Sequence, residues 1–373
     1  MKELSVKKSN GPSDRRSFLK KSLLAGTATV GAGLVGRSAA FGQRSSATRG
    51  DVAILRLLAA AELIEADLWQ QYAELGGLTP GQEPVETAPF TPMNNYQAAF
   101  MNLDPDGPQY ISSNNLDEQS HATFLNAYLQ AIGAQPVDLD QYRTLPSSKA
   151  TGAQQIGRLT NLTQLSVDTS WYTRYRSQTN PDFGATFAQA LPQLATGQFT
   201  AIPRNNNDLA NSNQIQVIAN TAAFHFGSIE QGGSSLYATL SQKVSSPEVL
   251  KITLGIGGDE ICHFLEWVDF SGNSVQPPVA PVEDPTTGLM FPNLDATVNP
   301  LLQTNLIFPV PCEFISPNLP MCAVIRPTSP GQIDAIGAIE SLIASGLFIG
   351  QPQAFLNMLL NLAQEADAAR REI

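Results

Sequence analysis

The sequence predicts an all-α fold organised as a four-helix bundle. Four long stretches place apolar residues three and four positions apart, which is the spacing of one helix face. A long connection, residues 137–212, separates the second stretch from the third and is interrupted by Pro, Gly and Asn. The second and fourth stretches each carry a Glu-x-x-His sequence within their apolar face.

The four helices are bounded by residues that typically start or stop a helix. They are expected at residues 52–75, 112–132, 213–244 and 248–270. Gly76 and Gly77 end the first helix, and Gly133 ends the second. Pro247 suits the first turn of the fourth helix, because its φ is already helical and it lacks an N–H that would have no partner there.

The connection between the second and third helices carries topological information. Short loops join antiparallel neighbours, whereas a connection as long as residues 137–212 lets these two helices run parallel. Within it, short helical patches are expected at residues 159–171 and 183–194. The bundle with this insertion would occupy residues 50–272.

The C-terminal part of the chain lies outside the predicted bundle. Residues 273–330 are rich in proline and are interpreted as an irregular strap over the bundle. Residues 331–373 are expected to form two further amphipathic helices, at 332–345 and 353–371.

Residues 1–43 resemble an export signal. Residues 13–20 read Ser-Asp-Arg-Arg-Ser-Phe-Leu-Lys, which is the twin-arginine pattern, and a weakly apolar run rich in Ala and Gly follows. Small residues place a cleavage region near residues 40–43. We therefore expect a soluble mature protein that is periplasmic or otherwise exported. The twin-arginine route carries folded cargo, which favours a protein loaded with a cofactor.

The mature chain is strongly acidic. The formal net charge is -11, and residues 1–43 contain eight Lys and Arg against two acidic residues, so the charge becomes about −17 once they are removed. Such a charge argues against nucleic acid and against anionic membrane surfaces as partners, since both require clustered Lys and Arg. It is compatible with attraction of cations.

The three cysteines do not form a metal-binding motif, because no Cys-x-x-Cys occurs. Cys312 and Cys322 could close a disulfide in an oxidising compartment, or could be two unpaired buried thiols. Cys262 is expected to point away from the face that carries His263 and to be a small buried residue.

Two of the three histidines follow a glutamate by three positions. They are His121 after Glu118 and His263 after Glu260. Residues three apart on a helix lie on one face, so each pair directs a carboxylate and an imidazole to one place. The surrounding face is apolar, and a buried carboxylate is costly unless it is paired or bound to a metal. The third histidine, His225, is expected to be a core or surface residue.

Each of the other two helices offers one carboxylate. Glu62 is the choice on the first helix, with Glu65 as its rival, and Glu230 is the choice on the third. Both Glu62 and Glu230 have an aromatic residue seven positions later, Trp69 and Tyr237, which are expected to pack in the core. Three acidic residues flank the motifs: Asp117, Asp259 and Glu266. They could hydrogen-bond the histidines, but solvated positions on the helices are favoured.

The complete set of predicted ligands mixes carboxylates and imidazoles. It comprises Glu62, Glu118, His121, Glu230, Glu260 and His263. Four carboxylates nearly neutralise two divalent cations, and this donor set suits iron or manganese rather than copper. We therefore expect two iron or manganese ions as the cofactors.

These motifs resemble the ferritin-like superfamily. Within it, Ala-Glu-Leu-Ile-Glu-Ala-Asp-Leu-Trp at residues 61–69, Glu118-x-x-His121, and Glu230 ahead of Glu260-x-x-His263 are similar to the exported ferritin-like and desiccation-related group. The resemblance covers about residues 50–272. It implies a dinuclear site in a four-helix bundle, with Glu62 and Glu230 as terminal ligands, Glu118 and Glu260 as bridges, and one histidine on each metal.

Two classes of function follow. A redox metalloprotein would act on Fe(II), dioxygen or peroxide and protect the cell envelope from oxidative stress, with metal ions and a small oxidant as partners. The alternative is a non-catalytic structural or stress-associated interaction protein. Storage of iron in a cage is less favoured, because the extra segments would have to lie outside the shell. A homo-oligomer is compatible with each of these functions.

Overall fold

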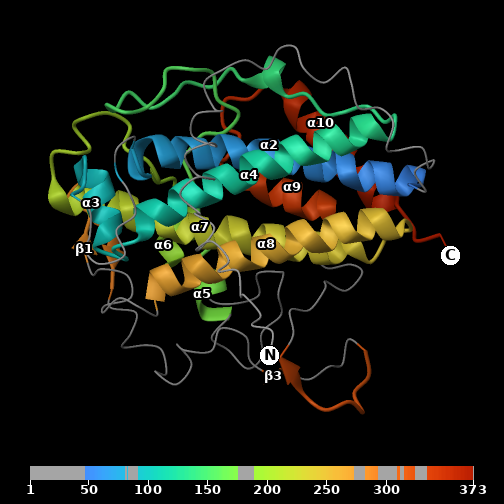
Figure 1. Cartoon of the computed structure of the whole chain (residues 1–373). Coiled ribbons are helices and arrows are strands. Elements are labelled where there is room, and N and C mark those ends of the chain that lie inside the picture. The colour runs from blue at the N-terminus through green and yellow to red at the C-terminus, as the bar shows by residue number, and fades with distance from the viewer. Residues whose placement is uncertain are drawn as a thin grey trace, which may run out of the picture. The chain divides into compact units, whose positions relative to one another are not determined.

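The computed structural model describes a mostly helical protein (Figure 1). The chain divides into two units, Met1–Arg44 and Ser45–Ile373, and the described residues belong to the second. They are residues 47–79, 82, 91–174, 189–272, 282–292, 309–310, 315–323 and 334–372. The expected all-α class is confirmed, whereas the expected export signal lies outside the described residues.

All four expected long helices are present. They are α2 (Arg49–Gly76), α4 (Gly107–Ala131), α7 (Ser212–Ser241) and α8 (Pro247–Gly272). Local signals explain their ends. Thr48 and Asp51 form a capping box at the start of α2, and the Asn211 side chain accepts hydrogen bonds from the first turn of α7. After α2, a Cβ at Gly77 would lie 2.6 Å from Ser112 Oγ, so only glycine fits this turn.

The long helices pack as two pairs, α2 with α4 and α7 with α8 (Figure 1). Hydrogen bonds between their ends define their directions. Asn102, just before α4, bonds Gln216 in the first turns of α7, so both helices start at the same end. Tyr128, near the end of α4, donates to Glu248 in the first turn of α8. These contacts give α4 and α7 the same direction.

The long connection is held against α2 by Asp67. This fully buried carboxylate accepts hydrogen bonds from the backbone N–H groups of Leu159 and Thr160 and pairs with Arg143 at 2.7 Å. The helical patch expected at residues 159–171 is largely wrong for this reason, because tertiary partners satisfy the backbone there. Within the described residues near this patch, the helices are α5 (Ser170–Arg174) and α6 (Pro192–Thr196). Part of the second expected patch, residues 183–188, lies outside the described residues.

Two short helices were not expected from the sequence. Helix α3 (Asn95–Met101) begins at an Asn94 cap and packs against α2, α4 and α7. The single-turn 3₁₀-helix η1 (Asp140–Tyr142) lies in the long connection.

The C-terminal helices α9 (Ala335–Ala344) and α10 (Gln353–Ala368) are those expected from the sequence. Helix α10 packs on α2 and on α9, and α9 also contacts α7. Asp367 accepts hydrogen bonds from the first N–H groups of α9 and pairs with Lys243 at 2.8 Å. The C-terminal helices are thus fastened to the long helices by both apolar and charged contacts.

The proline-rich segment contains regular structure where it is described. Two short antiparallel strand pairs occur, β1 (Val282–Glu283) with β2 (Met290–Phe291) and β3 (Pro309–Val310) with β4 (Cys322–Ala323). Cys312 lies outside the described residues, so the choice between a Cys312–Cys322 disulfide and two unpaired thiols stays open.

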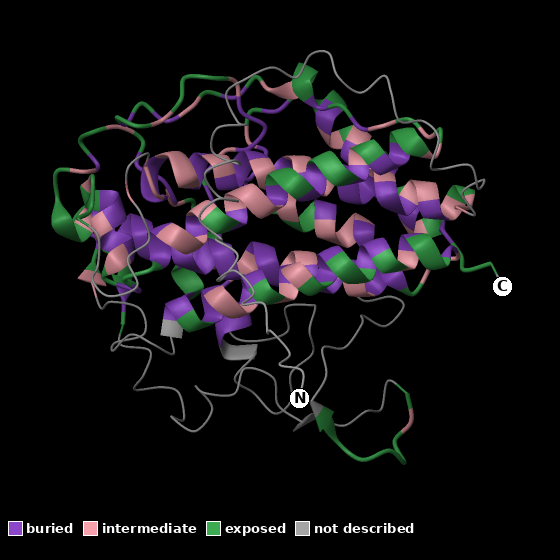
Figure 2. Cartoon of the chain, viewed as in Figure 1, coloured by how far each residue is buried: buried purple, intermediate pink, exposed green. Residues whose placement is uncertain are grey.

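The core lies where the long helices face one another (Figure 2). Trp69 stacks on Trp267 with ring centroids 5.2 Å apart, and Phe226 packs against both.

In the described part of the chain, no helix is long and apolar enough to cross a membrane.

Replacement of Asp67 should loosen the long connection. We expect Asp67→Ala to lower the free energy of unfolding by about 3 kcal/mol, because two buried backbone N–H groups lose their acceptor. Urea unfolding measures this loss. The control is Asp140→Ala, which removes an exposed partner of the same Arg143 and should change stability little. Equal effects of the two variants would contradict this role of Asp67.

Candidate metal centre

All six predicted ligands lie together and buried between the four long helices. Helix α2 supplies Glu62, α7 supplies Glu230, and α4 and α8 each supply a Glu-x-x-His pair. Their donor atoms form two groups, each within 4.8 Å: Glu62, Glu118, His121 and Glu260, and Glu118, Glu230, Glu260 and His263. Glu118 and Glu260 belong to both groups. These buried clusters could each hold a metal ion.

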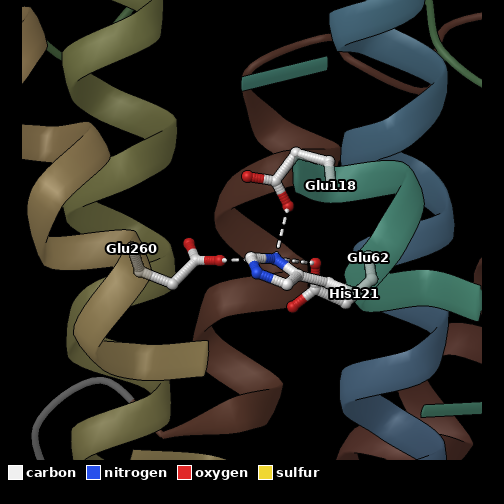
Figure 3. Close-up of side chains that lie close together, drawn as sticks. All are labelled: Glu62, Glu118, His121 and Glu260. Carbon is white, nitrogen blue, oxygen red and sulfur yellow. Dashed lines mark hydrogen bonds and ion pairs between the residues drawn. The ribbon is translucent and has the colours of Figure 1, made fainter. Parts of the chain in front are cut away.

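In both groups the imidazole directs Nδ1 toward the carboxylates. His121 Nδ1 lies 3.3 Å from Glu62 Oε2, 3.3 Å from Glu118 Oε2 and 3.7 Å from Glu260 Oε1 (Figure 3). His263 Nδ1 lies 3.0 Å from Glu118 Oε1 and 3.3 Å from Glu230 Oε2. His121 therefore faces carboxylates from three helices, and His263 faces carboxylates from two.

The outer nitrogen of each histidine is bonded by an aspartate from the opposite helix. His121 Nε2 lies 3.1 Å from Asp259, and His263 Nε2 lies 3.4 Å from Asp117. The favoured expectation, that these aspartates are only solvated, is wrong. Asp259 of α8 bonds His121 of α4, and Asp117 of α4 bonds His263 of α8. A carboxylate on Nε2 holds the ring in place and keeps Nδ1 available as a metal ligand. Glu266 instead accepts from Asn114.

The two aromatic residues expected in the core also bond the carboxylates. Trp69 Nε1 donates to Glu230 Oε1 at 2.9 Å, and the Tyr237 hydroxyl donates to Glu62 Oε1. Each aromatic residue follows the glutamate of its own helix by seven positions, yet it bonds the glutamate of the other helix. One oxygen of Glu62 and one of Glu230 are thereby held in position.

Several buried donor atoms remain without a hydrogen bond to any described residue. They are Oε2 of Glu62 and Glu230, Oε1 of Glu118, both carboxylate oxygens of Glu260, and Nδ1 of His263. Leaving buried polar atoms unsatisfied is costly, and most native proteins avoid it. Other unsatisfied buried atoms occur elsewhere in the described residues, but these six converge on the two groups. The residues present therefore fit a bound cation, which would satisfy them.

The pKa values of four of the predicted ligands are raised, and the buried negative charge of the surrounding carboxylates contributes to each shift. Burial and the neighbouring Glu62 raise the pKa of Glu118 to about 8, and burial with the surrounding glutamates raises that of Glu260. Burial alone would lower the pKa of His121, but its bonds with Asp259 and Glu118 raise it to about 12. The pKa of His263 is raised for the same kind of reason, with Glu230 as the largest favourable contribution. The site favours positive charge, as protons or as metal.

Glu62, rather than its rival Glu65, belongs to a ligand group. Glu65 nevertheless lies nearby. Burial and the charges of Glu118, Glu62 and Glu230 raise its pKa well above the ordinary value. The raised pKa favours a neutral, protonated Glu65 beside the site, where it is not one of the predicted ligands.

Two other sequence interpretations concern residues outside the ligand groups. His225 is a buried core residue, as expected, and its Nδ1 lies 2.7 Å from the Tyr72 hydroxyl. Burial lowers the pKa of His225 to about 3, so the ring is neutral. Cys262 is absent from the ligand groups, in agreement with its expected orientation, but the expectation that it is buried was wrong, because this cysteine is exposed.

Gly233 allows α7 to approach Glu260. A Cβ built at this position would lie 2.1 Å from Glu260 Oε2, whereas one at the adjacent Gly232 would meet no atom within 4 Å. A role for this glycine pair was not expected from the sequence. A Gly-Gly pair inside a helical pattern was the available signal, since glycine in a helix normally costs stability and usually has a packing reason.

The metal-free protein should lose stability as the pH rises. The folded-state pKa of Glu118, about 8, lies above its ordinary 4.5, so between these values the folded state binds more protons than the unfolded state. The raised pKa of His121 acts in the same direction above pH 6.5. Stability should therefore fall by about 1.4 kcal/mol per pH unit for each such proton.

Urea unfolding in a chelator from pH 5 to 9 measures this slope. Glu118→Gln should flatten it, and the exposed Glu248→Gln should follow the parent. Added Mn(II) should oppose the loss at high pH, since metal replaces protons on the ligands. A metal-free protein that becomes more stable toward pH 9 would contradict this electrostatic description.

Gly233 offers a second test with its own neighbour as the control. Gly233→Ala should lower Mn(II) affinity by about 10–100-fold, because the methyl group displaces Glu260. Gly232→Ala should bind Mn(II) as the parent does. Calorimetric titration of both variants measures the difference, and equal affinities would show that Gly233 does not position Glu260.

A comparison of the chain with family models, with curated proteins and with solved structures found no match. What the site can do must therefore follow from its own donors. These are four buried glutamates and two histidines on four helices, in two groups that share Glu118 and Glu260.

Proposed function

We propose that this protein is an exported, ferritin-like metalloprotein with a dinuclear iron or manganese centre. It would carry out redox chemistry on Fe(II), dioxygen or peroxide and so protect against oxidative stress. The observation that carries the proposal is the pair of overlapping ligand groups that share two glutamates. Two groups with shared carboxylates are the arrangement that two adjacent cations require, since a shared carboxylate can bind both.

The geometry supports a division of roles among the ligands. Glu118 and Glu260 are common to both groups and would bridge the metals. Glu62 and Glu230 belong to one group each, and an aromatic residue already bonds one of their oxygens, so each would be a terminal ligand. His121 and His263 would bind one metal each through Nδ1.

The helix directions support a ferritin-like bundle. Parallel α4 and α7, joined by a long crossover, agree with the connectivity of that fold. The reciprocal bonds, His121 with Asp259 and His263 with Asp117, give the two helix pairs an approximate two-fold relation. In a ferritin-like protein the Glu-x-x-His motif likewise occurs once in each pair.

When bound, iron or manganese would supply Lewis acidity and reversible electron transfer. The residues of the chain would supply the rest. The carboxylates balance the charge of the metals, and burial by the four helices keeps bulk water from the site. Tyr237 and Trp69 hold the terminal carboxylates, and Asp117 and Asp259 fix the two imidazoles. Mixed oxygen and nitrogen donors favour iron or manganese over softer metals.

A non-catalytic role is the alternative function. The C-terminal helices favour it to some degree, because α10 covers α2 and α9 contacts α7, and such additions could build a partner surface. In that case the metal would only stabilise the fold. Metal content and turnover separate the two functions.

Metal analysis is the first test. Mature protein purified without chelators should contain about two equivalents of iron or manganese by inductively coupled plasma mass spectrometry. Glu118→Ala/Glu260→Ala should lose both metals, because it removes the shared ligands. Glu248→Ala/Glu340→Ala, with the same change of charge at exposed positions, should retain them. A folded native protein without metal would refute the proposed centre.

Steady-state assays then distinguish a redox protein from a structural one. The metal-loaded protein should oxidise Fe(II) or decompose peroxide, and the Glu118→Ala/Glu260→Ala variant should not. Two bound metals with neither activity would support the structural alternative.

A further inference from the structure

A cavity of about 140 Å³ lies between α2, α7 and α9. Its walls are mostly aliphatic. Helix α2 contributes Leu57, Ala61 and Ile64, α7 contributes Leu236, and α9 contributes Ile339 and Leu342. Such walls offer few hydrogen-bonding groups, so the cavity suits an apolar occupant better than water.

One end of the cavity adjoins the metal centre. Glu65, Gly233 and Tyr237 all line it. The Tyr237 hydroxyl bonds Glu62, and a Cβ at Gly233 would touch Glu260 Oε2 and lie 3.6 Å from Glu65 Oε1. The cavity is therefore separated from two of the proposed ligands by one side chain or by one glycine. At α9 the lining includes the exposed Ser341, which places its mouth there.

The size of the cavity limits its occupant. An apolar protein cavity of about 150 Å³ binds benzene, so about 140 Å³ admits a molecule or side chain of about six carbon atoms. Dioxygen and peroxide are far smaller and would leave most of this volume empty.

We propose that this cavity binds a small apolar organic molecule, of about six carbon atoms, and holds it beside the metal centre. The role of the bound molecule rests on the proposed function, since the metals would act on it or respond to it. The binding itself depends only on the walls. Helix α9, one of the C-terminal additions, completes the cavity, which gives these extra residues a function.

Binding of fluorobenzene to the mature protein, followed by ¹⁹F NMR, tests the cavity. Saturable binding is expected. Gly232→Leu and Ala338→Leu fill the cavity from opposite walls, α7 and α9, and each should weaken binding by at least about tenfold. A Cβ at Gly232 meets no atom within 4 Å, so its side chain has room in the folded protein. Unfolding midpoints confirm that both variants are folded.

Gly255→Leu is the matched control, because a Cβ at this exposed position of α8 also meets no atom and lies away from the cavity. It should bind fluorobenzene as the parent does. Absence of saturable binding, or equal binding by the filled variants, would overturn the proposal.

Loading with Mn(II) tests the position beside the metal centre. Bound fluorobenzene should show strong paramagnetic broadening, which Gly232→Leu abolishes. Bound Mn(II) without broadening of the bound probe would refute the placement. If Mn(II) does not bind at all, the proposed function fails. Fluorobenzene binding that is lost in both filled variants would in that case still support the proposal that the cavity binds an apolar molecule.

Discussion

The structure depends on the concentration of negative charge at the centre of four helices. Glu62, Glu118, Glu230 and Glu260 are each fully buried, and Glu65 lies beside them. Among the described residues, the ion pairs of these four glutamates are with His121 and His263. The remaining negative charge is left to be neutralised by protons or by metal. Helices that enclose such a site are stable together only when cations or protons are present.

Hydrogen bonds between residues of different helices hold the rest of the site in place. Asp117 of α4 holds His263 of α8, and Asp259 of α8 holds His121 of α4. Helices α2 and α7 are linked in the same way: Trp69 of α2 donates to Glu230 of α7, and Tyr237 of α7 donates to Glu62 of α2. No helix positions its own ligand completely, so displacement of one helix would disturb donors on both sides. The complete set of contacts around the ligand groups is therefore present only when all four helices are packed together.

The sequence could predict the features that are local. Glu-x-x-His places both groups on one helix face, and the apolar period with Gly and Pro at the ends located α2, α4, α7 and α8. It could not predict contacts that depend on docking. His263 and Asp117 are 146 positions apart, and nothing near either residue specifies the other. Backbone bonds to Asp67 likewise replaced the helical patch expected at residues 159–171, because tertiary partners outweigh weak local preference.

Glu260 connects the metal centre with the cavity. It is the only one of the four buried ligand glutamates with neither oxygen hydrogen-bonded to a described residue, so its position is the least constrained by the protein. One side of its carboxylate faces the shared ligand groups, and the other meets the backbone of Gly233 at the cavity wall. A change of charge at the metals would be balanced most easily by movement of this carboxylate. Such movement would alter the cavity wall at Gly233, so under the two proposals above Glu260 would couple the bound metals to the occupant of the cavity.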